Sequence, residues 1–437
     1  MYIHRQLEKE IKPFLKRKEA LAVVGPRQAG KTTFIKHLES ELKKEKKKVK
    51  YITFEKKADL DLFQESVEDF RDLISQYECV IIDEFQYAKD GGQKLKYLYD
   101  TTKTKFIITG SSSLELTFQT GKYMVGRMLD FELAPFSFRE FLSFENEELF
   151  NLLNERIGGS SILKFNVKKG FGAEINKRLT AALEKYAVYG GYPAVVLSRG
   201  DKEKQKVLEN ILEKYLLRDI KSLLELASED KLLRLSKFLA AQAGNIIKYE
   251  ELSSVSRLTY RDVIKHLNIL EKTFVINLIR PFFTNKRTEL TKNPKNYFVD
   301  LGLRNYLLTD FRSIENRNDV GAIMENCACN LLYGLNLSPN LKYWRTKSKA
   351  EVDFVIEREQ NIYPIEIKYA SKRIVGKSFY SFVDKFDPKT GVILTKDYLG
   401  EEKIKNDKYF SSIELRWKPF YRVYQTSKYL NVAYVLF

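Results

Sequence analysis

The chain of 437 residues is long enough for about three domains, and its 44% of hydrophobic residues can fill several cores. Three cysteines are too few for a disulfide framework, so we expect them to serve as packing residues in a reducing environment. No apolar run approaches the ~18 residues of a membrane span, and residues 1–20 are charged and amphipathic without a signal-peptide core. We therefore expect a cytoplasmic protein without a membrane partner. The formal net charge of +17 favours polyanionic partners such as DNA.

The first predicted strand, residues 20–24, runs into a glycine-rich turn and then into a helical pattern. Gly25 and Gly30 stand at the GxxxxGK[ST] spacing and are followed by Lys31 and Thr32. This strand, turn and helix are the context of a P-loop, in which backbone N–H groups and a helix N-terminus bind a polyphosphate. Lys31 would reach the β- and γ-phosphates, and Thr32 would be a ligand of Mg²⁺. The predicted nucleotide contacts are Gly25, Pro26, Arg27, Gln28, Ala29, Gly30, Lys31, Thr32 and Thr33.

A second apolar run, residues 80–83, ends in Asp83 and Glu84 and is predicted to be a buried parallel strand. Carboxylates at such a strand end lie where open α/β sheets bind their ligands. Asp83 would hold Mg²⁺ through water, and Glu84 would polarise the attacking water, unless both simply form a solvated strand end. The alternation of strands and helices predicts a parallel, doubly wound α/β domain. Its five strands are expected at residues 20–24, 49–54, 80–83, 106–109 and 129–133.

Hydroxyl side chains follow the fourth predicted strand at Thr109, Ser111 and Ser112. They are candidates for sensing the γ-phosphate or orienting the water, with Ser111 as a predicted nucleotide contact. A turn rich in serine and glycine is the simpler alternative.

Several motifs in this order resemble the AAA+-type P-loop ATPases of archaea and bacteria that carry a C-terminal region of unknown function. They are GPRQAGKTT, VIIDEFQ, ITGSSS, the pair Gly126-Arg127 and APFSFREF at residues 134–141. YGGYP at 189–193, LLRDI at 216–220 and FVDLGLRNYL at 298–307 extend the resemblance over most of the chain. The resemblance implies ATP binding by Gly25, Gly30, Lys31, Thr32, Asp83 and Glu84.

The same resemblance implies a role for Arg127 as an arginine finger that acts on the nucleotide of a neighbouring subunit in a homo-oligomer. A structural or surface role is the alternative, and Lys122 and Arg139 compete for the finger role. No arginine stands beside the Gly-Gly-Tyr-Pro stretch, where the lid of these ATPases usually supplies a sensor arginine.

The pattern divides the rest of the chain after an ATPase core of residues 1–140. Residues 141–230 read as a helical lid and connector, broken at Gly-Gly pairs at 158–159 and 190–191. Residues 231–300 predict a winged helix-turn-helix, with helices near 231–243, 249–254 and 258–272 and β-like runs at 274–279 and 297–299.

In that winged helix, Tyr260, Arg261 and Lys265 would lie on the exposed part of the recognition helix, in contact with DNA. The basic residues expected on the wing, against phosphates, are Lys286, Arg287, Lys292 and Lys295. Docking of a protein is the alternative use of such a module.

Residues 301–437 contain a helix with Glu325 and then two strands, EVDFVI and YPIEIKY. Because side chains alternate along a strand, Glu366 and Lys368 share a face, and Asp353 on the adjacent antiparallel strand can converge with them. Asp353 and Glu366 are therefore predicted to hold a divalent cation, while Lys368 stabilises developing charge or helps to activate a water.

This set resembles the core of PD-(D/E)xK nucleases, with Asp353, Glu366 and Lys368 in the acidic and basic positions and Glu325 on the preceding helix. Val352 stands where these nucleases carry a proline. The resemblance implies metal-dependent cleavage of DNA, and a nuclease-like fold that binds DNA or protein without cutting is the alternative.

Two functions follow from the whole sequence. The first is an ATPase with the cofactors ATP and Mg²⁺ that acts on DNA. The second is an ATP-dependent switch or scaffold that binds a protein partner and whose nuclease-like fold is inert.

Overall fold

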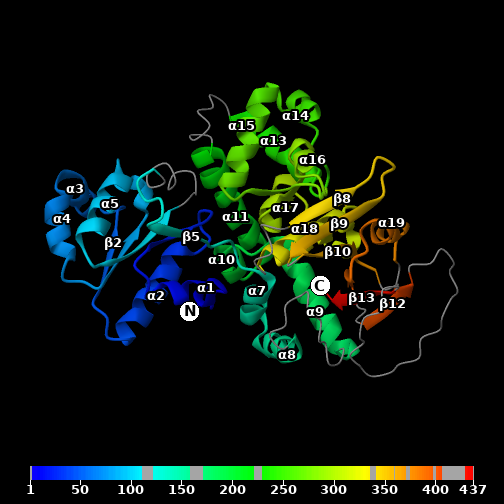
Figure 1. Cartoon of the computed structure of the whole chain (residues 1–437), viewed down its shortest axis with the longest axis horizontal. Coiled ribbons are helices and arrows are strands. Elements are labelled where there is room, and N and C mark those ends of the chain that lie inside the picture. Colours follow the sequence, from blue (N-terminus) through cyan, green and yellow to red (C-terminus); the bar gives the residue numbers. More distant parts are fainter. Residues whose placement is uncertain are drawn as a thin grey trace.

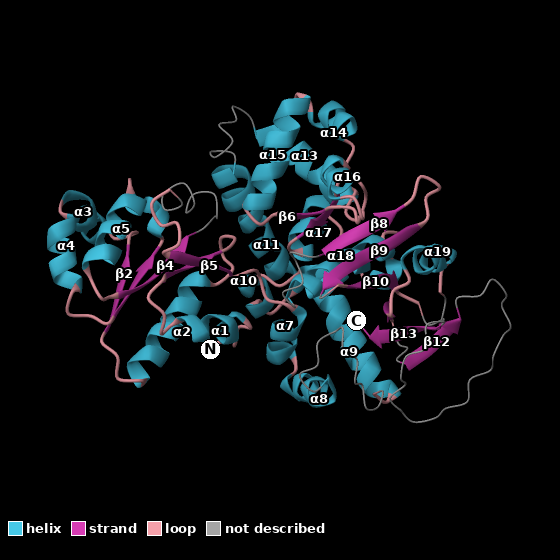
Figure 2. Ribbon diagram, in the orientation of Figure 1, coloured by secondary structure: helices cyan, strands magenta, loops and turns pink. Residues whose placement is uncertain are grey.

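The computed structural model describes residues 2–110, 122–157, 171–220, 229–334, 341–358, 360–370, 375–396, 400–405 and 429–436 (Figure 1). Two sheets lie at opposite ends of the molecule, and most of the helices lie between them (Figure 2). In these ranges no helix combines the length and the apolar character that crossing a membrane requires.

The N-terminal sheet consists, within the described residues, of five parallel strands in the order β2-β3-β4-β1-β5. The strands are β1 (Ala20–Val24), β2 (Val49–Thr53), β3 (Cys79–Asp83), β4 (Lys105–Gly110) and β5 (Met128–Glu132). Each predicted strand is present within one or two residues of its expected position. A short apolar run was a reliable signal here because β1 and β3 are buried on both faces.

Helices cover both faces of this sheet, as a doubly wound domain requires. They are α1 (Leu7–Ile11), α2 (Lys31–Lys44), α3 (Lys57–Glu65), α4 (Val67–Ile74) and α5 (Gly91–Thr101), with short 3₁₀ turns η1 (Lys12–Phe14) and η2 (Phe85–Tyr87). Apolar residues of α1 and α2 pack on one face with Leu21 and Val23 of β1. Those of α3, α4 and α5 pack on the other face with Ala20 and Ala22. The carboxyl ends of the strands are thereby left to the connecting loops.

The middle of the chain is helical, as predicted. Its elements are α7 (Phe138–Glu145), α8 (Glu147–Ile157), α9 (Ala173–Tyr189), α10 (Pro193–Leu197), α11 (Asp201–Ile211) and a π-helical continuation, η4 (Leu212–Ile220). Ser137 begins α7 with a capping box to Glu140, which explains part of the APFSFREF motif. Gly190 ends α9 with a φ of 76°, as expected from the second Gly-Gly pair, whereas the first pair lies outside the described residues.

Three helices and a hairpin follow in the predicted order. They are α13 (Glu229–Ala241), α14 (Tyr249–Ser256), α15 (Tyr260–Lys272), β6 (Ile276–Ile279) and β7 (Lys295–Phe298), with the antiparallel pair β6–β7 interrupted by α16 (Lys286–Thr291). Thr259 caps α15 by accepting a hydrogen bond from the backbone N–H of Asp262. The basic segment of the predicted wing, between the two strands, thus contains a short helix.

The C-terminal sheet is of mixed direction, with the order β12-β13-β11-β10-β9-β8 in the described residues. Its strands are β8 (Leu341–Arg345), β9 (Glu351–Arg358), β10 (Asn361–Lys368), β11 (Thr390–Thr395), β12 (Gly400–Lys405) and β13 (Tyr429–Leu436), and its helices are α18 (Val320–Gly334) and α19 (Lys377–Phe386). The predicted antiparallel pairing of EVDFVI with YPIEIKY is confirmed, since Phe354 pairs with Ile365. Cys327 and Cys329 are buried in α18, as expected of packing residues.

Two motifs that lie far apart in the sequence contact each other directly. Asp300 begins α17 (Leu301–Leu308) and accepts hydrogen bonds from the backbone N–H groups of Gly191 at 2.7 Å and Leu303 at 2.9 Å. A Cβ on Gly302 would lie 2.0 Å from the carbonyl oxygen of Tyr189, so only glycine allows this approach. The YGGYP and FVDLGLRNYL segments are therefore two halves of one contact.

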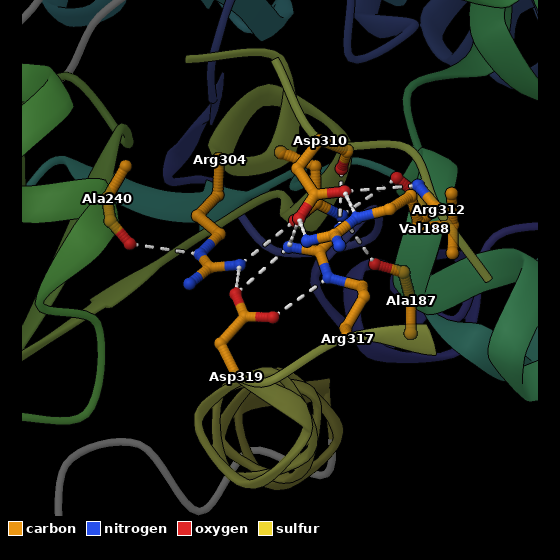
Figure 3. A network of polar contacts seen from close by, with 9 residues as sticks. Ala187, Val188, Ala240, Arg304, Asp310, Arg312, Arg317 and Asp319 are labelled. Carbon is orange, nitrogen blue, oxygen red and sulfur yellow. Dashed lines mark hydrogen bonds and ion pairs between the residues drawn. The ribbon is translucent and has the colours of Figure 1, made fainter. Parts of the chain in front are cut away.

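A polar network around Arg304 of α17 lies close to this contact (Figure 3). Arg304 is fully buried and donates to the carbonyl oxygen of Ala240 in α13 at 3.0 Å and to Asp319 at 2.6 Å. Arg317 binds both oxygens of Asp319 at 2.9 Å. Leu303 and Leu307 pack in one hydrophobic core with α11 and α13 to α15. The expected domain boundary between residues 300 and 301 therefore does not separate two cores.

Candidate functional site

The predicted P-loop connects β1 to α2 at the carboxyl end of the sheet. Gly30 has a φ of 92°, which favours glycine, and a Cβ at Gly25 would lie 2.2 Å from the carbonyl oxygen of Leu133. Gln28 also has a positive φ, 62°, and is exposed together with Thr33. Residues 25–33 thus adopt a tight turn that directs the N-terminus of a 14-residue helix toward the loop.

Lys31 is almost fully buried inside this loop. Its Nζ donates hydrogen bonds to the carbonyl oxygens of Gly25 at 3.0 Å and Pro26 at 2.8 Å. Burial lowers the pKa of Lys31 to about 8, although Glu84 and Asp83 act in the opposite direction. The ammonium therefore sits between the loop and the acidic pair, at the position expected for contact with phosphates.

Asp83 connects the loop to the neighbouring strands. Its Oδ2 accepts from the hydroxyl of Thr32 at 2.8 Å and from that of Tyr51 at 2.8 Å, and its Oδ1 accepts from Thr109 at 2.5 Å. Thr32 and Asp83 are the two residues predicted to hold Mg²⁺, and the structure brings them into direct contact across 51 positions of sequence.

Glu84 follows Asp83 in a left-handed conformation, with a φ of 57°. Its backbone N–H donates to Thr109 Oγ1 at 3.0 Å, and its carboxylate accepts a hydrogen bond from Gln86. Burial raises the pKa of Glu84, and the nearby Lys31 opposes this shift. A non-glycine residue in this conformation is strained, and such strain is common at functional sites.

Of the three hydroxyl side chains predicted to sense the γ-phosphate, the structure describes Thr109 alone. Thr109 is occupied by Asp83 and by the N–H of Glu84, so its hydroxyl positions the acidic pair. Ser111 and Ser112 lie outside the described residues.

Two residues at this site were not predicted. Tyr51 contacts Asp83 from the end of β2, and Arg5 donates through Nη1 to the carbonyl oxygen of Ala29 in the P-loop at 3.0 Å. Arg5 is buried and also binds Glu140 at 3.2 Å. Neither residue belongs to a recognisable motif, because each acts through a contact distant in sequence.

Arg127 lies at the amino end of the strands, whereas the P-loop lies at their carboxyl end. Its carbonyl oxygen accepts from the N–H of Ala20, at the start of β1, and its Nε binds Asp100 at 3.1 Å. The five residues of β1 separate this end of the sheet from the P-loop by about 16 Å. Arg127 therefore cannot serve the nucleotide site of its own chain. Of the competing residues, Arg139 binds Asn154 in α8, and Lys122 is exposed.

The second predicted site also converges, on β9, β10 and α18. Asp353 accepts from the backbone N–H of Ile367 at 2.8 Å, and Glu366 Oε1 binds Lys368 Nζ at 2.7 Å. Glu325 joins them from α18, and its carboxylate oxygen, one of Glu351 and one of Asp353 all lie within 4.8 Å of one another. Glu351 was not singled out by the sequence.

Lys295 enters this cluster, and the prediction that it faces phosphate on a wing is wrong. Its side chain is 1% exposed and its Nζ binds Glu325 at 2.9 Å and Glu351 at 2.5 Å. Burial would lower the pKa of Lys295, but Glu325, Glu351 and Asp353 together raise it. The physical reason is the position of β7, which directs this lysine against α18 and β9 instead of toward solvent.

Lys295 neutralises Glu325 and Glu351, which leaves the carboxylate oxygens of Asp353 and Glu366 to be accounted for. Among the described residues, Asp353 forms no ion pair, and Glu366 Oε2 is buried without a hydrogen-bond partner. Burial raises the pKa of both carboxyl groups, with Glu325 adding to the shift and Lys368 opposing it at Glu366. Glu366 Oε2 is thus a buried acceptor without a donor, and it lies on the strand next to Asp353.

The predicted DNA-contact residues of α15 are exposed. Arg261 and Lys265 stand one helical turn apart, and Tyr260 and Ile264 expose apolar surface beside them. Arg287 and Lys292 are also exposed, and Lys286 is exposed but binds Glu357 at 2.9 Å.

The parallel sheet, the glycine turn around Lys31 and the contact of Thr32 with Asp83 are the geometry of a P-loop NTPase domain. Residues 17–142 match the family model described as the AAA domain. Residues 180–313 and 320–415 match two family models that are each described as a domain of unknown function. The first of these matches includes α17, in agreement with its packing on α13. The AAA match and the P-loop geometry support ATP binding.

Relatives of similar organisation occur in archaea and bacteria. An uncharacterized protein of Methanocaldococcus jannaschii is 25% identical over 352 residues, which cover 78% of this chain and 73% of that protein. An uncharacterized protein of Mycobacterium tuberculosis is 25% identical over 372 residues, covering 84% of this chain and 74% of its own length.

Solved structures with some similarity include the replication initiator DnaA bound to AMPPCP and single-stranded DNA. It is 13% identical, with a TM-score of 0.30, over 62% of this chain and 90% of DnaA. The Aeropyrum pernix ORC1 protein in complex with DNA is 14% identical, with a TM-score of 0.29, over 71% and 93% of the two chains. Scores of this size do not bear on function.

Proposed function

We propose that this protein is a Mg²⁺-dependent ATPase whose turnover is coupled to DNA binding. The observation that carries the proposal is the 2.8 Å contact between Thr32 Oγ1 and Asp83 Oδ2, next to a buried Lys31. A hydroxyl and a carboxylate in contact at the mouth of a P-loop are the donor set that Mg²⁺ with a nucleotide requires.

Each residue has a role in this proposal. The loop N–H groups and Lys31 hold the β- and γ-phosphates, and Thr32 and Asp83 hold the metal, directly and through water. A Mg²⁺ ion held there would supply charge neutralisation on the phosphates. Glu84 polarises the attacking water, and Thr109 keeps both acidic residues in position through its two hydrogen bonds.

Arg127 completes a neighbouring site in an oligomer. Its distance from the P-loop of its own chain excludes action in cis, and its side chain, which is 36% exposed, can act on a second copy once it leaves Asp100.

DNA is contacted by residues 229–298, which form a winged helix in this proposal. Three helices followed by a hairpin are the element order of this module, with α15 as the recognition helix. Arg261 and Lys265 contact DNA from α15, and Arg287 contacts a phosphate from the wing, with Lys286 available once it leaves Glu357.

The first experiment measures phosphate release from Mg-ATP with and without double-stranded DNA, with Lys31→Ala as the blank. Stimulation by DNA would support the coupling. Turnover that is indifferent to DNA would instead favour the switch that binds a protein partner.

DNA contact itself is tested by binding at several salt concentrations. Arg261→Ala and Lys265→Ala are each expected to reduce the slope of log K against log salt by about 0.9, because each removes one phosphate contact. Lys202→Ala changes an exposed lysine of α11 and is the matched control. Binding without salt dependence would overturn the assignment.

Metal-dependent cleavage of DNA is a second candidate function, carried by the unpartnered Glu366 Oε2 beside Asp353. Asp353 and Glu366 would hold the cation, Lys368 would stabilise the charge that develops on phosphate, and Lys295 would neutralise Glu325 and Glu351. The residues fit a hard divalent cation, because the free acceptors are carboxylate oxygens. Cleavage with Mn²⁺ or Mg²⁺ that survives both Asp353→Ala and Lys368→Ala would refute these roles.

A further inference from the structure

Two of the three histidines in the chain meet at one carboxylate on the N-terminal domain. His4 Nδ1 lies 3.1 Å and His37 Nε2 lies 3.7 Å from Glu8 Oε2. One ligand atom of each residue lies within 4.8 Å of the others. His4 and Glu8 stand four positions apart at the start of the chain, and the fold brings His37 of α2 to them.

We propose that His4, Glu8 and His37 form a binding site for a transition-metal ion, with zinc as the ion they suit best. Two imidazole nitrogens and one carboxylate oxygen are a common set of three protein ligands for Zn²⁺, with water in the fourth position. Ligand atoms around a tetrahedral zinc lie about 3.4 Å apart, given bonds of about 2.0–2.1 Å. The observed separations need only small side-chain movements to reach that value.

The surroundings of Glu8 orient it for this role. Its Oε1 accepts from the Tyr2 hydroxyl at 2.8 Å and from the backbone N–H of Arg5 at 2.8 Å, which leaves Oε2 directed at both histidines. The Tyr2 ring stacks on His37 at 3.8 Å. Hydrogen bonds that fix a ligating carboxylate are the usual outer shell of a metal site.

Solvent reaches the three residues mainly at His4. The side chain of His4 is 79% exposed, whereas those of Glu8 and His37 are 22% and 19% exposed. An ion could therefore enter past His4 and keep a water ligand there.

The location suggests what the metal would do. His37 lies on α2, the helix that begins at Lys31, and Arg5 follows His4 and contacts the P-loop at Ala29. A metal joining the N-terminal segment to α2 would hold Arg5 in place against the P-loop. This is a structural or regulatory site, separate from the Mg²⁺ site at Thr32 and Asp83.

The test is a titration of the full-length protein with Co²⁺ in the absence of nucleotide, followed by displacement with Zn²⁺. We expect one ion per chain to show the visible absorption of four-coordinate cobalt bound by nitrogen, which an ion held by carboxylates alone at Asp353 and Glu366 would not show. His4→Ala and His37→Ala should each weaken binding by about 100-fold or more, and Tyr2→Phe by about 10-fold. Circular dichroism checks that each variant is folded. His4→Ala changes an exposed side chain and should leave the core intact.

Asp353→Asn separates this site from the acidic cluster of the C-terminal sheet and should leave the cobalt spectrum unchanged. The proposal is overturned if the wild-type protein shows no saturable binding, if both histidine variants bind as tightly as wild type, or if only Asp353→Asn abolishes the signal.

Discussion

Replacing Lys295 by methionine tests the charge balance of the C-terminal cluster. The change removes an ammonium that is 1% exposed and that binds Glu325 at 2.9 Å and Glu351 at 2.5 Å. Glu351 keeps Arg345 at 2.9 Å, but Glu325 loses its only ion pair among the described residues. Breaking a buried pair in this way costs about 3–5 kcal/mol, because a buried charge is left without compensation.

Lys286→Met is the matched control in the same hairpin. Lys286 also binds a glutamate, Glu357, at 2.9 Å, but its side chain is 59% exposed. An exposed pair of this kind contributes about 1 kcal/mol or less. The two variants remove the same group and differ mainly in burial.

The assay is urea unfolding followed by the fluorescence of Trp344, which is buried in β8 next to the cluster. A Trp417→Phe background removes the other tryptophan, so the signal reports the C-terminal sheet alone. Lys295→Met should lose several kcal/mol in metal-free buffer and regain about 2.7 kcal/mol when Mn²⁺ is present at 100 times its dissociation constant. A loss no larger than that of Lys286→Met would refute the account of this cluster.

Three further outcomes are expected. Glu84→Gln should retain ATP binding, measured with a fluorescent nucleotide, and lower kcat by about 100-fold or more; normal turnover would show that another group positions the water. Arg127→Ala should slow hydrolysis only in an oligomer, and mixing with a Lys31→Ala protein, which keeps Arg127, should restore it; a defect that mixing leaves unchanged would exclude action in trans. Gly302→Ala should destabilise the protein by about 1–3 kcal/mol in thermal unfolding because its Cβ would meet the backbone of the segment before Gly190. The control Gly321→Ala, with nothing within 4 Å, should be neutral or slightly stabilising.

The sequence predicts best where local pattern and burial agree. The five strands of the first sheet are short apolar runs because both faces are covered, so their pattern is unambiguous. The period of two along a strand correctly placed Glu366 and Lys368 on one face, with Asp353 opposite on the neighbouring strand.

Prediction fails where a residue's role depends on a distant partner. Lys295 stands among other lysines and an arginine in a polar segment, and its burial depends on Glu325 and Glu351, which lie 30 and 56 positions further along the chain. Tyr51 and Arg5 are also ordinary residues in sequence and acquire a role only through contacts made in the folded chain.

The Gly-Gly-Tyr-Pro stretch lacks the expected sensor arginine, but its backbone makes contacts that connect the two halves of the chain. Pro193 lies beside the P-loop, since a Cβ on Gly30 would be 3.5 Å from its ring. Two positions earlier, Gly191 accepts from the N–H of Phe136 at 2.7 Å and donates to Asp300 at 2.7 Å. The segment thus contacts the P-loop, the end of the first sheet and the start of α17 through its backbone. Space for a long charged side chain is absent at Gly191, because even a Cβ would lie 2.1 Å from the carbonyl oxygen of Phe136. Close backbone packing, and not a charge at the γ-phosphate, is therefore what this segment contributes to the connection between the nucleotide domain and the C-terminal half.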